Sequence, residues 1–296
     1  MSKELEQYTQ FVQNFVTLHN EAKTLPLGTS IEAAEPTKTS ELSAYVFAPH
    51  PDDEAIIGAL PLRLRQENGV KITNVAVTLG SNKARQAGRK AELTAACETL
   101  GFELLIPGNV DTGIEAVNPA TRDGKPAEWA EKVALIVAEL KKARPNVLLF
   151  PHDDDFNSSH IGTHHLVVDA LKEIAKEDSS YAPLLIESEF WHMMNGPNLL
   201  VGVSIEDEAR LVYAISAHTE EVVRNPYHTK HPCRMHDNVL RASEVIGGQG
   251  GQGAEMEFGM IYKATKLVNG ELVPAWDGGK VLAPSDDLQV LLDLAK

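Results

Sequence analysis

Short apolar runs alternate with longer amphipathic segments between residues 45 and 176. In each longer segment apolar residues recur every three or four positions, which is the spacing of one face of an α-helix. We predict strands in the apolar runs at 45–49, 71–79, 103–106 and 146–150, and helices in the longer segments at 54–68, 84–100, 128–143 and 161–176. This alternation is typical of a mostly parallel sheet with helices on both faces. The pattern therefore predicts an α/β fold.

The pattern differs on either side of this region. Residues 4–24 have apolar residues at near-helical spacing and predict a helix, whereas residues 25–43 predict an extended connector. After residue 183 we expect strands at 184–189 and 199–205, a helix at 206–217, a loop at 224–238 and a hairpin at 255–267 and 272–276. We therefore expect an N-terminal helix and connector at 1–43 and a single α/β domain at 44–296, whose C-terminal part (183–296) shapes the pocket.

Two segments of the C-terminal part have an unusual composition. The predicted loop contains His228, His231 and His236, and we interpret it as a rim that touches substrate or as a solvent-exposed loop. Residues 247–253 read Gly-Gly-Gln-Gly-Gly-Gln-Gly. This segment lacks the Lys-Ser/Thr of a P-loop and does not join a strand to a helix. We interpret it as a mobile lid or flexible rim.

Composition narrows the class of protein and its partners. The chain has 296 residues, of which 43% are hydrophobic and 23% charged, as in ordinary soluble globular proteins. A formal net charge of −15 without a basic patch argues against a nucleic-acid partner. Cys97 and Cys233 are too few for a disulfide framework. No signal-peptide core and no apolar run of membrane-spanning length is visible, so we expect a cytoplasmic protein.

A group of ionisable residues follows the first predicted strand. His50, Asp52, Asp53 and Glu54 crowd into one turn before a predicted helix. Acids at the end of a buried strand are costly to desolvate, and a bound cation would offset that cost. His50 and Asp53 could both reach one ion, which would leave Asp52 free to handle protons. In the alternative interpretation the acids only cap the helix, where negative charge is favoured, but capping does not explain the His-Pro before them.

A second group follows the strand predicted at 146–150. Residues 151–165 read Pro-His-Asp-Asp-Asp-Phe-Asn-Ser-Ser-His-Ile-Gly-Thr-His-His. His160 and His164 are four positions apart and could share one helical face, so either is a candidate ligand. Active sites of parallel α/β sheets lie at the carboxyl ends of the strands. We therefore expect the two groups to meet at one edge of the sheet.

Together the two groups predict a mononuclear metal hydrolase. Catalytic zinc usually takes three protein ligands from His, Asp, Glu or Cys and keeps an open position for water. The metal activates that water and polarises the scissile carbonyl, and a carboxylate that does not bind metal takes the proton. Asp52 is the candidate base. The donor set favours Zn²⁺, although iron, manganese or cobalt would fit the same donors.

The sequence Ala-Pro-His-Pro-Asp-Asp-Glu at 48–54 resembles the signature of the PIG-L/LmbE-like de-N-acetylases. Weaker similarities lie at Arg89-x-x-Glu92 with Leu100-Gly101, at Asp111, at Asn157-Ser-Ser-His160 and at Ala217-His218-Thr219. The resemblance covers most of residues 44–260. It implies a Rossmann-like α/β fold and a zinc-dependent hydrolase that removes acetyl from an N-acetylated amino sugar. The expected partner is then a small N-acetylated sugar or sugar conjugate.

The resemblance also implies roles for individual residues. By position it implies metal ligation by His50, Asp53 and His160, a general base at Asp52, sugar-hydroxyl binding by Arg89 and Asp111, and an active-site position without a firm role at His218.

Asn157 departs from the family pattern, which has His at this position. In relatives that His helps to polarise the carbonyl or protonate the leaving amine, whereas Asn can donate a hydrogen bond but cannot transfer a proton. We expect Asn157 to contact substrate and His164 or His218 to take over the proton transfer. The second hypothesis is an altered or non-catalytic member, which keeps the metal but cleaves a different acyl amide or serves as a carbohydrate-binding module. The subunit number stays open, with a homo-oligomer among the options.

Overall fold

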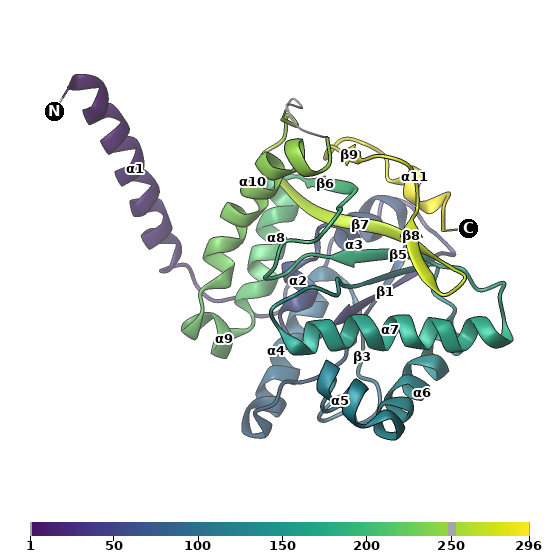
Figure 1. Ribbon diagram of the computed structural model, residues 1–296. Coiled ribbons are helices and arrows are strands. Elements are labelled where there is room, and N and C mark those ends of the chain that lie inside the picture. Colours follow the sequence, from purple (N-terminus) through teal and green to yellow (C-terminus); the bar gives the residue numbers. More distant parts are fainter. Residues whose placement is uncertain (1, 248–252, 296) are drawn as a thin grey trace.

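A nine-stranded sheet forms the centre of the molecule in the computed structural model, which describes residues 2–247 and 253–295 (Figure 1). The strand order is β3-β2-β1-β4-β5-β7-β6-β9, and β8 pairs with β7. The strands are β1 (Ser43–Ala48), β2 (Lys71–Ala76), β3 (Glu103–Leu105), β4 (Val147–Pro151), β5 (Leu184–Ser188), β6 (Leu199–Val203), β7 (Phe258–Val268), β8 (Glu271–Pro274) and β9 (Lys280–Leu282).

The first five strands form the parallel half of the sheet. β1 pairs in parallel with β2 on one side and with β4 on the other, so the chain reverses its direction of strand addition between these two strands. In doubly wound α/β sheets ligands bind at such a switch point, outside the carboxyl ends of the strands. β7 then runs antiparallel to β5 and β6. The predicted Rossmann-like α/β class is confirmed, with an antiparallel extension built from the C-terminal part.

Two apolar clusters cover the two faces of the sheet. Within β1, Ala44 and Val46 belong to one cluster, and Tyr45 and Phe47 belong to the other. Burial on both faces explains why the strands read as continuous apolar runs. The first face is covered mainly by α3 (Ala59–Asn68), α4 (Gln86–Leu100), α8 (Ile205–Ser216) and α10 (Tyr227–Val245), and the second by α6 (Pro126–Ala143) and α7 (Ser158–Glu177).

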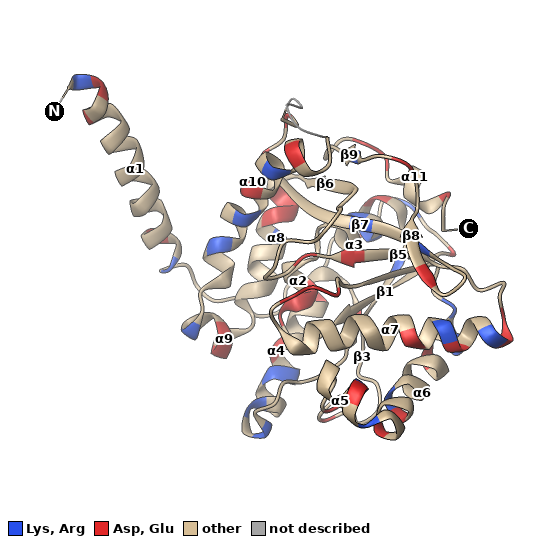
Figure 2. Cartoon of the chain, viewed as in Figure 1, with Lys and Arg blue, Asp and Glu red and all other residues tan. Residues whose placement is uncertain are grey.

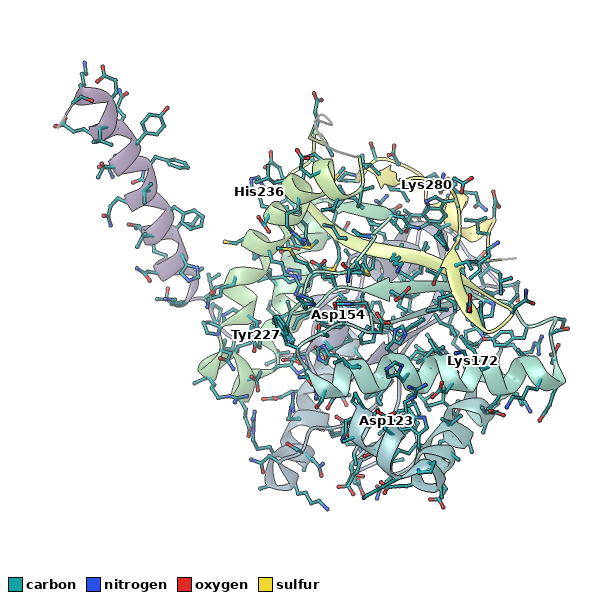
Figure 3. All side chains as sticks on the ribbon, viewed as in Figure 1. Asp123, Asp154, Lys172, Tyr227, His236 and Lys280 are labelled. Carbon is teal, nitrogen blue, oxygen red and sulfur yellow. The ribbon has the colours of Figure 1, made fainter. Side chains whose placement is uncertain are left out.

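The N-terminal helix α1 (Lys3–Ala22) stands apart from this body. It buries none of its residues and projects from the rest of the chain in Figure 1, with its side chains spread into solvent in Figure 3. The connector that follows has no regular element and attaches to α8, where Gly28 N donates to Ser216 Oγ at 2.8 Å. Among the described residues, no helix has both the length and the apolar character needed to cross a membrane.

Two predicted elements differ from the structure. The helix predicted at 54–68 is split into α2 (Asp53–Ile56) and α3, because the chain turns at Ile57 and Gly58. A Cβ on Gly58 would lie 2.6 Å from Leu211 Cδ2, so the break lets α2 pack closely on α8. The absence of a side chain at Gly58 therefore allows α2 and α8 to lie close together.

The prediction of a loop at 224–238 is wrong, because most of this segment is helical. Residues Thr219–Arg224 form α9, and α10 runs through Pro232 in its interior. A proline inside a helix costs about 3 kcal/mol, but Met235, Val239 and Ala242 recur at helical spacing and bury against the sheet. Their burial, at roughly 1.5–3 kcal/mol for each large side chain, outweighs that cost. The periodicity past Pro232 was the signal that sequence reasoning missed.

The remaining differences are short elements. The prediction omitted a 3₁₀ turn at Lys83–Arg85, α5 (Pro119–Gly124), β9 and α11 (Gln289–Leu292), each of at most a few residues. The hairpin predicted at 255–267 and 272–276 is confirmed as β7 and β8, which pair antiparallel. The glycine-rich segment at 247–253 lies mostly outside the described residues, so its interpretation as a lid stays a prediction.

Candidate active site

The predicted site lies at the switch point between β1 and β4. β1 ends at Ala48 and β4 ends at Pro151, and the ionisable groups follow each strand directly. The turn after β1 places Asp52 in the left-handed region, with φ 108°. A non-glycine residue there is uncommon and costs about 1–3 kcal/mol, so the surrounding structure must hold it in place. The turn thereby directs the side chains of residues 50–53 toward the edge of the sheet.

His50, Asp53 and His160 converge on one point. His50 Nδ1 lies 3.3 Å from Asp53 Oδ2, and His160 Nε2 lies 3.4 Å from the same oxygen. One donor atom from each residue lies within 4.8 Å of the others. The backbone N–H of His50 also donates to Asp53 Oδ2 at 2.9 Å, which fixes the carboxylate between the two rings. These three residues are therefore placed to hold one cation.

The burial of His160 supports a cation at this point. The His160 side chain is buried, and within the described part of the chain neither ring nitrogen has a hydrogen-bond partner. Its Nδ1 faces Asp155 Oδ2 at 3.6 Å, and Asp155 accepts hydrogen bonds from the backbone of Asn157 and Trp191. Metal-bound imidazoles commonly face a carboxylate through their second nitrogen. Two His and one Asp form a donor set that suits a divalent transition metal.

The electrostatics of the cluster favour positive charge. Burial alone lowers the pKa of His160, but the charges of Asp53 and Asp155 outweigh burial and raise it to about 9. For Asp53, burial raises the pKa, while His160 and His50 outweigh burial and lower it below the usual range. The raised pKa of His160 and the lowered pKa of Asp53 both indicate that this cluster favours an anionic carboxylate beside a positive charge.

Asp52 lies beside this cluster without joining it. It lines a cavity of about 460 Å³ together with His50, Asp53 and His160. Burial raises the pKa of Asp52 well above its usual value, the charge of Asp53 raises it further, and Arg89 opposes both. The backbone N–H of Asp52 donates to Glu54 Oε2 at 3.0 Å. A buried carboxylate next to, but outside, a candidate metal cluster is suited to exchange protons.

The wall of the cavity includes residues that the sequence prediction missed. Glu221 and Arg224 come from α9, and Tyr227 is the first residue of α10, labelled in Figure 3. Arg224 donates two hydrogen bonds to the Glu221 carboxylate, at 2.7 and 2.6 Å. Burial raises the pKa of the Tyr227 phenol, which keeps it a hydrogen-bond donor at neutral pH. The sequence interpretation placed His228, His231 and His236 of the loop predicted at 224–238 on a rim, but none of these three residues lines the cavity.

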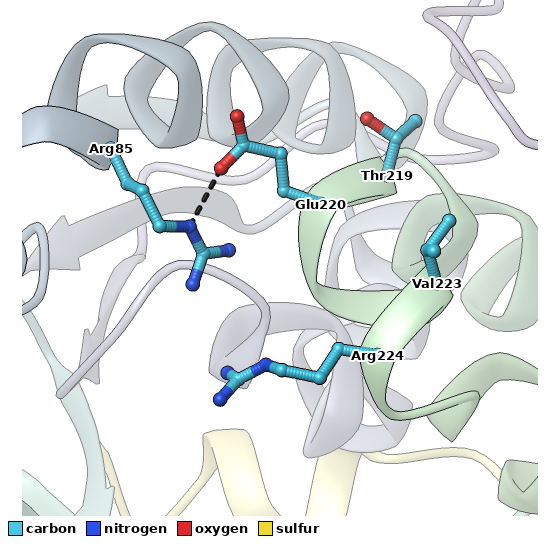
Figure 4. A pocket seen from close by; sticks show the side chains of 5 residues that line it. All are labelled: Arg85, Thr219, Glu220, Val223 and Arg224. Carbon is cyan, nitrogen blue, oxygen red and sulfur yellow. Dashed lines mark hydrogen bonds and ion pairs between the residues drawn. The ribbon is translucent and has the colours of Figure 1, made fainter.

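The rim of the cavity continues into a shallow surface pocket beside α9. Arg85 and Arg224 line both hollows, and Figure 4 shows the second one with Thr219, Glu220 and Val223. Arg85 Nε donates to Glu220 Oε2 at 2.7 Å. Because Glu220 and Glu221 balance these two arginines, the rim is polar without a strong net charge.

The predicted substrate residues fall in different places. Arg89 lines the cavity and donates from Nη2 to the carbonyl of Pro51 at 2.9 Å. Asn157 also lines it and caps α7, since its Oδ1 accepts from Ser159 N at 2.9 Å. Asp111 is 79% exposed, pairs with Lys90 at 3.0 Å and is not among the residues that line the cavity. Two of the three residues are therefore placed to meet a ligand there.

His164 and His218, predicted as proton donors, are buried and do not line the cavity. His164 Nδ1 lies 3.0 Å from the carbonyl of Pro151, and burial lowers its pKa to about 4, so it is neutral at pH 7. His218 Nε2 lies 2.8 Å from Glu54 Oε1, on the far side of Glu54 from Asp52. This arrangement lets His218 hold Glu54, which in turn holds the turn that carries Asp52.

Comparisons with known proteins agree with this site. Residues 45–171 match the family described as PIG-L, GlcNAc-PI de-N-acetylase. A probable N-acetyl-α-D-glucosaminyl L-malate deacetylase 2 from Bacillus cereus is 27% identical over 152 residues, which cover 47% of this chain. The match spans 64% of that relative's own length, which is less than two thirds.

Two solved structures share the fold. The conserved protein TT1542 from Thermus thermophilus has a TM-score of 0.55 at 18% identity, over 75% of this chain and 93% of its own. GalB, the 4-carboxy-2-hydroxymuconate hydratase from Pseudomonas putida, has a TM-score of 0.52 at 16% identity, over 77% and 96%. At these identities the likeness concerns the fold alone. The matched residues 45–171 contain His50, Asp53 and His160 together, so the part of the chain that forms the candidate site is similar to the PIG-L family of de-N-acetylases.

Proposed function

We propose that this protein is a metal-dependent hydrolase that removes an N-acetyl group from an amino sugar or a sugar conjugate. The observation that carries the proposal is the convergence of His50, Asp53 and His160 within 4.8 Å, next to the free carboxylate of Asp52. The family match and the Bacillus cereus relative, whose name is that of an N-acetylglucosaminyl malate deacetylase, support the substrate class.

The metal would be held by His50, Asp53 and His160. A divalent ion at this point would supply Lewis-acid polarisation of the amide carbonyl and activation of a water molecule. Two imidazoles and one carboxylate suit zinc, and they also suit iron, manganese or cobalt. Asp155 would orient His160 through the second ring nitrogen, because its carboxylate is itself fixed by two backbone N–H groups.

In this proposal Asp52 takes the proton from the attacking water. A general base must lie within reach of the proton and must be free of the metal, and Asp52 lines the cavity outside the convergent set. Glu54 fixes its backbone, and His218 pairs with Glu54 at 2.8 Å. His218 therefore acts through Glu54 as a positioning residue, which replaces the role of proton donor expected from the sequence.

The cavity wall offers hydrogen-bond donors for the substrate. Arg89, Asn157 and Tyr227 all line it. We assign Arg89 and Asn157 to binding of the sugar or the acetyl group, and the protonated Tyr227 phenol to the carbonyl oxygen, where charge develops during attack. His164 takes no part in proton transfer here, because it is neutral and turned to the carbonyl of Pro151.

A second candidate function is an altered member of the family that acts on a different acyl group or only binds carbohydrate. Asn157 favours it, because the cavity wall has an amide where the family has His. The fold is also compatible with other reactions, since GalB, a hydratase, has it. The two candidates differ in whether acetate is released from an N-acetylated amino sugar.

The proposal also includes a small-molecule partner, a cytoplasmic location and one domain over residues 44–296. Cys97 and Cys233 are both free thiols, as a reducing compartment allows. Residues of the C-terminal part, such as Tyr227, line the same cavity as His50, so the two parts would work as one unit.

The decisive experiment measures acetate release from N-acetylglucosamine conjugates by the metal-reconstituted protein. Asp52→Asn should lower the rate by about 10²–10⁴-fold, because it removes the base, while the metal content stays unchanged. Asp123→Asn is the matched control, since Asp123 lies exposed on α5, away from the cavity (Figure 3), and should keep full activity. Equal rates for Asp52→Asn and wild type would refute the role of Asp52. Absence of acetate release from every such conjugate would favour the second candidate.

A further inference from the structure

Helix α1 exposes an apolar face that nothing in the described chain covers. Its large apolar residues point into solvent, and Tyr8 and Phe11 are 70% and 67% exposed. Isolated helices are marginal in water, so most helices are stabilised by packing an apolar face. The face consists of residues at alternating spacings of three and four, flanked by further apolar positions: Leu5, Tyr8, Val12 and Phe15, with Phe11 and Val16. This is the pattern of a helix that packs against other helices.

The polar residues of α1 point to a protein partner rather than a membrane. From Gln7 to Leu18 the helix has no charged residue, and Figure 2 shows charge only toward its ends. Helices that lie on membranes have a strongly charged polar face rich in Lys and Arg, and α1 has a single lysine, Lys3. The chain's net charge of −15 also repels anionic lipid.

A second uncovered apolar surface lies between α8 and α10. This surface, the α8–α10 groove, encloses about 450 Å³. It follows a helical stripe along α8 and faces two residues of α10: Ile205, Ala209, Val212 and Ser216, with His228 and Pro232. Grooves between two helices with such a stripe receive a third, amphipathic helix. The stripes of α1 and α8 have matching lengths, about 15 Å from Leu5 to Phe15 and about 17 Å from Ile205 to Ser216, at 1.5 Å rise per residue.

The groove also contains buried polar atoms that need a partner. Both ring nitrogens of His228 are buried, and no hydrogen bond to either is formed within the described residues. Oε2 of Glu208 is also buried without a hydrogen-bond partner among the described residues, although Oε1 of the same side chain lies 2.8 Å from His231 Nδ1. Buried polar atoms are seldom left unpaired, because losing their hydrogen bonds to water without a replacement is costly. An occupant with a hydroxyl group beside apolar groups would suit this groove, and the apolar face of α1 has the Tyr8 hydroxyl.

The connector directs α1 away from its own groove. Leu25 and Pro26 line one end of the groove, and Gly28 is tied to the end of α8 by the 2.8 Å bond to Ser216. A residue before proline is restricted to extended conformations, so Leu25 opposes the tight turn that would fold α1 back. In Figure 1 α1 accordingly leads away from the body. A groove on a second copy of the chain can receive it without such a turn.

We propose that two copies of this chain exchange their α1 helices, each placing the apolar face of α1 in the α8–α10 groove of the other. The assembly is a two-fold symmetric dimer, because the same pair of surfaces is used twice. This interaction surface is independent of the reaction proposed for the cavity.

Sedimentation velocity of the full-length protein over a range of concentrations tests the proposal. The wild type should sediment as a dimer of the 32.3 kDa chain. Val12→Glu with Phe15→Glu should give monomer, since two charges would enter the groove. Gln10→Glu with Thr17→Glu adds the same charge on the opposite face of α1 and should remain dimeric. Because the substituted residues of α1 are exposed, both variants should keep the fold, as their far-ultraviolet circular dichroism can verify.

A cross-link distinguishes exchange from docking within one chain. In a Cys233→Ser background, one tagged copy has Val12→Cys and another has Ala209→Cys, a groove position. Mild oxidation of the mixture should link the two tags, whereas Thr17→Cys in place of Val12→Cys should not. A monomer at all concentrations, a dimer insensitive to Val12→Glu with Phe15→Glu, or linkage only when both cysteines are on one chain would overturn the proposal.

Discussion

Histidines gather in two regions of this molecule, at the cavity and along α10, and in each region a buried histidine faces a carboxylate. His160 faces Asp53 at 3.4 Å and Asp155 at 3.6 Å, while His231 on α10 faces Glu208 at 2.8 Å. Both rings are buried. The two rings differ in their hydrogen bonds. Both nitrogens of His231 have a partner, Glu208 and the carbonyl of Ile56. Neither nitrogen of His160 has a hydrogen-bond partner within the described chain.

The difference shows what marks a metal site. A buried imidazole with a partner for each nitrogen is complete, and its role is structural. At the cavity the donor atoms of three residues instead converge on one point and leave the His160 ring unsatisfied. The histidine content of a segment therefore says less than convergence, which only the fold can create.

The largest expected effect comes from removing a convergent ligand. His160→Ala should abolish stoichiometric metal binding and reduce amide hydrolysis to background, because two donors rarely hold a catalytic metal. His236→Ala is the control: this ring is exposed on α10 (Figure 3), so the variant should keep its metal content and rate. Elemental analysis after reconstitution and dialysis measures the first quantity. Stoichiometric metal in His160→Ala would place the ion elsewhere.

Much of the parallel half of the fold follows from the sequence. Apolar runs at β1, β2 and β4 and the amphipathic helices between them predict parallel strands, because a strand buried on both faces cannot alternate. The rule that sites lie at the carboxyl ends of such strands then brings His50 and His160 together. The structure places them with ring centroids 5.3 Å apart.

The rest of the site depends on contacts that the sequence does not encode locally. Tyr227 and Glu221 reach the cavity only because α9 and α10 pack there. Pro232, inside α10, made this segment read as a loop in the sequence. Asp111 was placed by resemblance to an acid after a strand, but its loop pairs it with Lys90. His218 was expected in the cavity and lies behind Glu54. Which side of a buried carboxylate a histidine occupies is decided by packing.

A second prediction concerns the pair formed by His231 on α10 and Glu208 on α8. His231→Leu should lower the free energy of unfolding by about 3–5 kcal/mol, because it leaves Glu208 buried without its partner. Metal content should stay unchanged, in contrast to His160→Ala. Urea denaturation measures the loss. The double variant His231→Leu with Glu208→Leu should regain most of it, since no buried charge remains; a double variant as unstable as the single one would show that packing, rather than the pair, sets the cost.

The smallest effect tests the carboxylate behind the cavity histidine. Asp155 relates to His160 as Glu208 relates to His231, but at 3.6 Å it can act only by orienting a ring that a metal holds. Asp155→Asn keeps an oxygen for one of the two backbone N–H groups that Asp155 now accepts and removes the charge. Metal affinity should fall about 10–100-fold, as for other partners of metal-bound histidines, and competition with a chelator of known affinity measures it. Asp154→Asn, at an exposed neighbouring acid, controls for the general loss of charge. If both variants bound metal equally well, Asp155 would be a loop anchor, and the two histidine regions would differ only in where their rings point.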